Sequence, residues 1–216
     1  MRQFVVIGLG RFGSSVAKTL FNLGYDVLGI DVNEEIVQSL ANSVTHAVQA
    51  DATDENTLKA LGVRNFDVGI VAIGGDIQSS ILVTLILKEL GIKYVIAKAQ
   101  NDLHGKVLYK IGADRVVFPE RDMGIRVAHN LIASNILDYI ELSPNFSIVE
   151  LEALPEWYDK TLGELKMRKR HGINVMAIKR GEDVVVSPGA EDLIKKGDIL
   201  VVVGQNKDIE KLEKFV

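Results

Sequence analysis

Short apolar runs alternate with amphipathic stretches along roughly the first 134 residues. Runs of mostly apolar residues bounded by glycine or polar residues are typical of buried strands, and they lie at 4–7, 27–30, 45–48, 68–72, 94–97 and 115–118. Helical patterns lie between them, at 34–41, 54–61, 77–90 and 103–111. This alternation predicts an α/β fold with a doubly wound parallel sheet of about six strands.

Two of the helical patterns carry more apolar residues than an outer helix of such a sheet needs. The pattern at 77–90 is apolar around most of its circumference, which favours a second, subunit-facing surface over simple deep burial. A pattern at about 121–139 places apolar residues at helical spacing after the sixth strand. We expect a connector helix there that also packs on a partner.

The pattern of predicted strands and helices changes after residue 134. The turn signal Ser143-Pro144-Asn145 marks a linker over 135–145. Beyond it, strand patterns lie at 147–151, 173–179, 183–186 and 199–203, with a turn at Pro188-Gly189 and helical patterns at 162–169 and 207–215. Residues 146–216 therefore predict a small separate α+β domain, after a first domain at 1–134.

Composition excludes several classes of function. The net charge of −4 gives no global basic character, so we expect no nucleic-acid partner. The chain has no cysteine, which excludes disulfides, thiol nucleophiles and cysteine-based metal sites. The first strand begins by residue 4, leaving no room for a signal peptide, and no apolar run approaches the length of a membrane span. These features favour a soluble cytoplasmic protein.

The glycine motif at residues 8–13, Gly-Leu-Gly-Arg-Phe-Gly, follows the first strand and opens a helical pattern. Gly8 permits a tight turn, Gly10 lets the backbone approach a phosphate, and Gly13 lets the helix pack close to the sheet. Asp31 ends the second strand, where a carboxylate accepts hydrogen bonds from ribose hydroxyls and repels a 2′-phosphate. The whole unit predicts a Rossmann-like site for a nucleotide or dinucleotide other than NADP.

Two charged residues bear on the identity of the ligand. Arg11 stands inside the glycine turn, where a guanidinium pairs with phosphate oxygens and favours ADP or ATP; the alternative is an arginine in solvent. Glu120 follows the sixth strand, and the carboxyl ends of strands face the ligand crevice. It could hold a hard cation that accompanies phosphate, or form a surface salt bridge.

No catalytic constellation accompanies the glycine motif. None of the four histidines has metal-pair spacing or belongs to a triad, and the nucleophile-elbow, Walker-lysine and HExxH motifs are missing. An oxidoreductase needs a proton-transfer residue or a metal beside its nicotinamide, so we expect a protein that is not an enzyme. An NAD(H)-dependent oxidoreductase or NAD(H) redox sensor is the alternative. The basic segment at 166–171 is either a solvated helix end or an anion site.

Seven segments together resemble the RCK (or KTN) family of cytoplasmic regulators of potassium conductance, which combine TrkA-N and TrkA-C domains. The resemblance covers essentially the whole chain, and the motifs occur in the family order. The segments are 6–13 (VIGLGRFG), 31–35 (DVNEE), 46–56 (HAVQADATDEN), 71–80 (VAIGGDIQSS), 97–101 (AKAQN), 110–124 (KIGADRVVFPERDMG) and 177–204 (AIKRGEDVVVSPGAEDLIKKGDILVVVG).

The resemblance implies a nucleotide site in the first domain, for ATP or ADP and, in some relatives, NAD. In this sequence the implied residues are Gly8, Gly10, Arg11, Phe12 and Gly13 at the phosphates, Asp31 and Asn33 at the ribose, Asp51, Ala52 and Thr53 at the adenine, Ile73 and Gly74 beside the nucleotide, and Lys98 near the phosphates. It also implies that Arg11 reaches the γ-phosphate and that Glu120 holds a cation such as Mg²⁺ or Ca²⁺ between paired nucleotides.

The resemblance further implies a second ligand and an assembly. Cyclic di-AMP is expected at a dimer interface of the C-terminal domain, on Arg168, Asn174, Val175 and Pro188. Dimers are expected to assemble into an octameric ring under an integral-membrane potassium transporter subunit, at the inner face of the cell membrane. The expected function is a nucleotide-sensing regulatory subunit that gates potassium transport.

Overall fold

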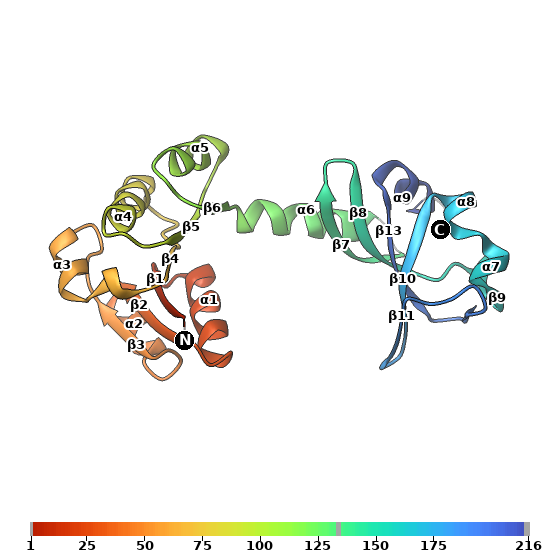
Figure 1. The fold of residues 1–216 in the computed structure, drawn as a ribbon, viewed down its shortest axis with the longest axis horizontal. Helices are drawn as coiled ribbons and strands as arrows, with labels where there is room; N and C mark the ends of the chain where they lie inside the picture. The colour runs from red at the N-terminus through yellow and green to blue at the C-terminus, as the bar shows by residue number, and fades with distance from the viewer. Residues whose placement is uncertain (1, 133–134, 214–216) are drawn as a thin grey trace. The chain divides into compact units, whose positions relative to one another are not determined.

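The computed structural model describes residues 2–132 and 135–213, and the chain divides into two compact units, Met1–Pro119 and Glu120–Val216. Figure 1 shows a sheet flanked by helices in the first unit and a mainly antiparallel sheet in the second. Within the described ranges, no helix is both long and apolar enough to span a bilayer.

The first unit is built on a six-stranded sheet in which all strands run parallel. The strand order is β3-β2-β1-β4-β5-β6, so the chain leaves one side of β1 after β3 and continues on the other side at β4. This confirms the predicted doubly wound sheet. The strands are β1 Gln3–Ile7, β2 Asp26–Asp31, β3 His46–Gln49, β4 Val68–Val71, β5 Tyr94–Lys98 and β6 Arg115–Val117.

Helices cover both faces of this sheet, because successive side chains of a strand point to opposite faces. Val5 and Ile7 join one buried cluster with Leu87 of α4, whereas Val6 joins another with Ala17 of α1. The helical elements are α1 Arg11–Asn22, α2 Glu34–Leu40, α3 Glu55–Ala60, the 3₁₀ turn η1 Val63–Asn65, α4 Ile77–Glu89 and α5 Asp102–Lys110.

The helices of the first unit begin in two different ways. Side chains cap the N-termini of α2 to α5 by accepting hydrogen bonds from free backbone N–H groups, and these caps are Asn33, Asp54, Asp76 and Asn101. The N-cap residue of helix α1 is Gly10, which has no side chain with which to cap the helix. Its first N–H groups therefore remain available to a ligand.

Helix α4 shows the two-sided apolar character that the sequence indicates. Val83, Ile86 and Leu87 are buried, while Leu82 and Leu85 on the same helix are exposed by 42% and 37%. An exposed second face of this kind is typical of a surface that contacts another protein. The subunit interface expected here stays a prediction.

The connector helix ends earlier than the sequence pattern predicts. Helix α6 spans Pro119–Ile132, residues 133 and 134 lie outside the described part, and Ile136–Ser143 forms strand β7. The expected helix to residue 139 and the expected linker at 135–145 are therefore wrong over this stretch. The reason is tertiary: Ile136 and Tyr139 fit a helical spacing, but this segment satisfies its backbone by pairing antiparallel with β8.

The second unit has a five-stranded antiparallel sheet in the order β11-β10-β13-β8-β7 and a two-stranded sheet of β12 and β9, which confirms the predicted α+β class. The remaining strands are β8 Phe146–Glu152, β9 Lys160–Thr161, β10 Ile173–Arg180, β11 Asp183–Val186, β12 Leu193–Ile194 and β13 Ile199–Gln205. The helical elements are η2 Pro155–Trp157, α7 Leu162–Leu165, α8 Met167–His171 and α9 Asn206–Glu213.

The single helix predicted at 162–169 is two short helices. Lys166 has φ = 50° and ψ = 47°, a left-handed conformation that ends α7 and turns the chain into α8. The start of α7 is fixed by a capping box. The Thr161 hydroxyl oxygen accepts from the backbone N–H of Glu164, and the Glu164 carboxylate accepts from the backbone N–H of Thr161. The break reorients the basic segment along α8.

One buried carboxylate closes the turn before β13. Asp198 is fully buried and accepts hydrogen bonds from Nε and Nη2 of Arg180, both at 2.7 Å. The backbone N–H of Lys195 donates to the same carboxylate at 2.8 Å. Because Arg180 also donates to the carbonyl oxygen of Leu193, this network ties β10 to the segment between β12 and β13.

Candidate functional site

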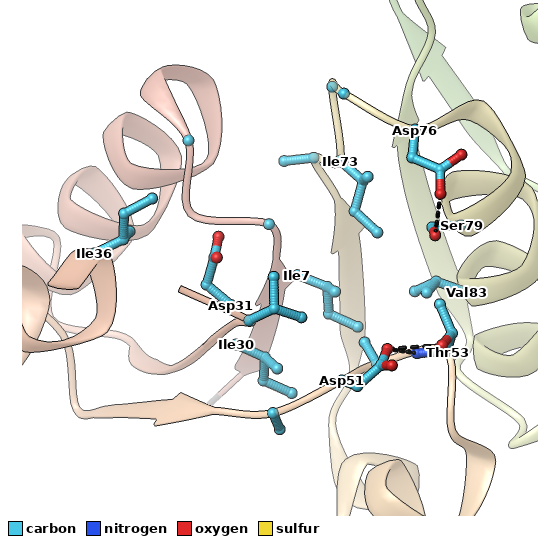
Figure 2. Close-up of a pocket in the computed structure, with 18 residues that line it drawn as sticks. Ile7, Ile30, Asp31, Ile36, Asp51, Thr53, Ile73, Asp76, Ser79 and Val83 are labelled. Atoms are coloured by element: carbon cyan, nitrogen blue, oxygen red, sulfur yellow. Dashed lines mark hydrogen bonds between the residues drawn. The ribbon is translucent and has the colours of Figure 1, made fainter. Parts of the chain in front are cut away.

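A cleft of about 440 Å³ opens at the carboxyl ends of β1 and β4, where the chain switches from one side of the sheet to the other. Its lining comes from the ends of β1, β2, β3 and β4 and the residues that follow them, and from the first turns of α2 and α4. Figure 2 shows Asp31 and Asp76 on opposite sides of Ile73, with Asp51 and Thr53 at the foot of the cleft. Ligands of doubly wound sheets bind at this switch point.

The cleft brings together eight of the residues that the sequence predicts at the nucleotide. They come from four segments far apart in the chain, which the parallel strands carry to one edge. These residues are Gly8, Gly10, Asp31, Asp51, Ala52, Thr53, Ile73 and Gly74.

Each of the three glycines of the turn is required for a different structural reason. Gly8 has φ = +89°, and a Cβ there would lie 2.9 Å from the backbone nitrogen of Ile73. A Cβ at Gly13 would lie 1.9 Å from the carbonyl oxygen of Gly8, so only glycine lets α1 approach this closely. No atom lies within 4 Å of a Cβ built at Gly10, which faces open space at the start of α1. Gly8 and Gly13 are therefore required for close packing, and Gly10 leaves room for a ligand.

Asp31 is held in position by the backbone around the glycine turn. Its Oδ2 accepts from the N–H of Leu9 at 2.6 Å, and its Oδ1 accepts from the N–H of Asn33 at 2.9 Å. A carboxylate has about four acceptor positions, so these two bonds leave capacity for ribose hydroxyls. The bonds orient the carboxylate at the end of β2 before any ligand arrives.

Asp51 and Thr53 form a hydrogen-bonded turn after β3. The hydroxyl of Thr53 donates to Asp51 Oδ1 at 2.7 Å, and the Thr53 backbone N–H donates to the same oxygen at 2.9 Å. The hydroxyl bond, followed by the backbone bond, lowers the pKa of Asp51 from its ordinary value. Asp51 is therefore an ionised acceptor at neutral pH.

Five other predicted residues of the first unit do not line the cleft. Arg11 is the exposed first residue of α1, Phe12 on the same helix is partly buried against the core, and Gly13 is buried. Asn33 caps α2 by accepting from the N–H groups of Glu35 and Ile36. Lys98 lies at the cleft edge, where its Nζ would be 3.2 Å from a Cβ on Gly74.

Glu120 belongs to the second unit, where it is an exposed residue in the first turn of α6. Across the described residues, no group of three or more histidine, aspartate or glutamate side chains is arranged to hold a metal ion. The cation assigned to Glu120 thus stays a prediction.

Sequence reasoning missed two polar residues of the cleft, Asp76 and Ser79. Asp76 caps α4, and Ser79 lies in the first turn of that helix. The signal was present in the sequence: Asp76 and Ser79 form an Asp-x-x-Ser pattern in the segment that follows the fourth strand, and this pattern predicts a helix start at the carboxyl edge of the sheet. The same rule that pointed to Glu120 applies to these residues.

A second hollow, of about 380 Å³, lies in the second unit. It brings together all four residues predicted at the second ligand: Arg168, Asn174, Val175 and Pro188. Nη2 of Arg168 donates to Asn174 Oδ1 at 3.1 Å, so the guanidinium is already oriented at the rim. The broken helix at Lys166 makes this possible, because it turns α8 toward β10.

Two protein-family models match the chain, the TrkA-N domain over residues 4–119 and the TrkA-C domain over residues 146–216. The chain belongs to the TrkA-N/TrkA-C family of potassium uptake proteins. It is 53% identical over 215 residues to the Ktr system potassium uptake protein C of Bacillus subtilis (strain 168), with 100% of this chain and 97% of the relative covered. It is 50% identical over 212 residues to protein A of the same system, with coverages of 98% and 96%.

A solved structure of the GsuK protein bound to ADP is similar to part of this chain. The two are 29% identical with a TM-score of 0.51, over 60% of this chain and 33% of that protein. The two Ktr relatives, which this chain matches over nearly their whole length, are components of potassium uptake systems. The prediction that the chain is not an enzyme is confirmed.

Proposed function

We propose that the chain is the nucleotide-sensing regulatory subunit of a potassium uptake system, and that it binds ATP and ADP in the 440 Å³ cleft. The observation that carries this proposal is the cleft itself. In it the uncapped start of α1 at Gly10, the Asp31 carboxylate at the end of β2 and the Asp51–Thr53 turn lie together. The similarity to a protein solved with ADP supports it.

In this proposal the phosphates lie against Gly8 and Gly10, at the positive end of the α1 dipole. Asp31 accepts from the ribose hydroxyls, and the segment from Asp51 to Thr53 borders the adenine, with Ile73 and Gly74 closing the other side. Lys98 and Arg11 add positive charge at the phosphate end, and Glu120 supplies a ligand for an accompanying cation such as Mg²⁺ or Ca²⁺.

Regulation requires that ATP and ADP favour different conformations. A ligand shifts an equilibrium only by its difference in affinity for the two states. Arg11 and the cation at Glu120 would contact the γ-phosphate, which ADP lacks. The chain would then act as a ring of dimers, an octamer, at the inner face of the cell membrane, where its shape gates a potassium-conducting membrane subunit.

The Arg11→Ala variant tests the nucleotide step. We expect ATP affinity to fall about ten-fold, because a charge-assisted bond to phosphate is lost, and ADP affinity to fall less than about three-fold. Isothermal titration calorimetry on the purified full chain measures both. Lys18→Ala is the matched control, since it removes an exposed positive charge from the same helix beyond the glycine turn.

Potassium flux through the reconstituted complex tests the regulatory step. ATP should support a higher flux than ADP, and equal flux with the two nucleotides would contradict the proposal. Tight NADH binding without ATP binding would instead favour the alternative of an NAD(H) redox sensor.

We further propose that the 380 Å³ hollow of the second unit binds cyclic di-AMP and that this ligand inhibits transport. Arg168→Ala should weaken cyclic di-AMP binding about ten-fold, because a guanidinium that pairs with a phosphate is removed. Arg170→Ala is the control, since Arg170 lies on the same helix α8 but does not line this hollow. Equal losses in the two variants would show a general charge effect and exclude the hollow as the site.

A further inference from the structure

The nucleotide cleft is lined by acidic and not by basic side chains. Of the described residues that line it, three are aspartates, Asp31, Asp51 and Asp76, and none is lysine or arginine. Nucleotides are polyanions, so a carboxylate that lines the cleft and holds no cation either contacts an uncharged part of the ligand or repels its phosphates. Asp31 and Asp51 have proposed uncharged partners, the ribose and the adenine. Asp76 has no such partner.

The Asp76 carboxylate is held firmly in place. Its Oδ1 accepts from the backbone N–H of Gln78 at 2.9 Å, and its Oδ2 accepts from the hydroxyl of Ser79 at 2.5 Å. The Ser79 bond, followed by the Gln78 bond, lowers the pKa of Asp76. The group therefore carries a full negative charge at neutral pH, and it cannot swing away without uncapping α4.

Asp76 makes the two sides of the cleft electrostatically different. On the α1 side, the helix start at Gly10 has no capping side chain, and no acidic residue lies in the first turn. On the α4 side, the helix start already holds a carboxylate, which occupies the position that a phosphate would take at an open helix N-terminus. The same ligand charge is attracted on one side and repelled on the other.

We propose that Asp76 is the charge-selecting residue of the cleft: it confines phosphates to the α1 side and weakens binding in proportion to the negative charge of the ligand. This inference rests on the proposed nucleotide function. It assigns Asp76 a role in ligand orientation and selectivity that is separate from its capping of α4.

The Asp76→Asn variant separates charge from capping, because asparagine caps a helix as well as aspartate does. We expect ATP to bind the variant more tightly by about three-fold, which corresponds to a screened repulsion at several ångströms. The gain should be smaller for ADP and absent for adenosine. It should shrink as the salt concentration rises, since salt screens the repulsion.

Asp54 provides a matched control in the same unit. It caps α3 with the same geometry: its Oδ1 accepts from the N–H of Asn56 at 3.1 Å, and its Oδ2 accepts from the hydroxyl of Thr57 at 2.7 Å. It does not line the cleft. Asp54→Asn therefore removes one charge from an equivalent cap and should leave the order of nucleotide affinities unchanged.

Titration calorimetry with ATP, ADP and adenosine at two salt concentrations decides between the outcomes. Equal changes for ATP and adenosine, or equal effects of Asp76→Asn and Asp54→Asn, would overturn the role of Asp76 and leave the nucleotide function standing. Failure of the unaltered chain to bind ATP and ADP would overturn the nucleotide function and this role together. Asp76→Ser, a second uncharged cap, should reproduce the result if Asp76→Asn folds poorly.

Discussion

Replacing Gly13 by alanine is expected to destabilise the first unit by at least about 3 kcal/mol, because the new Cβ has no space. It would lie 1.9 Å from the carbonyl oxygen of Gly8, a backbone atom that cannot move without displacing β1 or α1. Hydrogen exchange of the β1 amides measures the loss. The single tryptophan, Trp157, is buried in the second unit, so its fluorescence should report unchanged unfolding there.

Gly10→Ala is the matched control for this result. It adds the same methyl group to the same turn, but no atom lies within 4 Å of the new Cβ, and the φ of −62° suits alanine. Stability should stay within about 0.5 kcal/mol of the unaltered chain, whereas nucleotide affinity should fall, because the methyl group occupies the phosphate space. If the two variants were equally stable, the close approach of α1 to Gly8 would not be a constraint.

Replacing Asp198 by asparagine is expected to destabilise the second unit by about 2 kcal/mol, since it breaks the two charge-assisted hydrogen bonds between the buried Asp198 carboxylate and the partly exposed Arg180. Urea unfolding followed by Trp157 fluorescence measures the effect directly. Asp183→Asn removes a charge from an exposed position on β11 and should change the unfolding free energy little.

The same carboxylate predicts a pH dependence of stability. Burial by itself raises the pKa of Asp198, but the hydrogen bonds from Arg180 and from the Lys195 N–H outweigh it, and the pKa is lowered overall. A carboxyl whose pKa is lower in the folded state stabilises fully above its unfolded pKa of about 4, and this contribution is lost as the pH falls through the folded value. Asp198→Asn should therefore flatten the acid limb of the stability curve. An unchanged limb would contradict this account.

The first unit could be predicted almost element by element, because its signals are local. Each buried parallel strand is a short apolar run, and the residue types at Asn33, Asp54 and Asn101 mark helix starts. Of the cleft residues, Gly8, Gly10 and Asp31 followed from the glycine motif and the end of the second strand. The others, Asp51, Ala52, Thr53, Ile73 and Gly74, were predicted from the family resemblance. Asp76 was missed although both its capping pattern and its place after the fourth strand were visible in the sequence.

The second unit was harder to predict because its structure depends on long-range pairing. Strand β7 has a helix-compatible spacing of Ile136 and Tyr139, and only the partner β8 decides otherwise. The break at Lys166 has no sequence signal either, because lysine rarely adopts a left-handed conformation. The four residues of the 380 Å³ hollow were nevertheless predicted from the family resemblance and lie together.

The strand order has a consequence for the folding of the first unit. One wall of the cleft comes from residues 7–53 and the other from residues 72–83, so the two walls belong to successive βαβ halves of the chain. A bound nucleotide would link these halves as a reversible cross-link, stabilising the folded unit by mass action. Neither half could hold the ligand alone, so nucleotide occupancy would also report that both halves of the first unit are assembled.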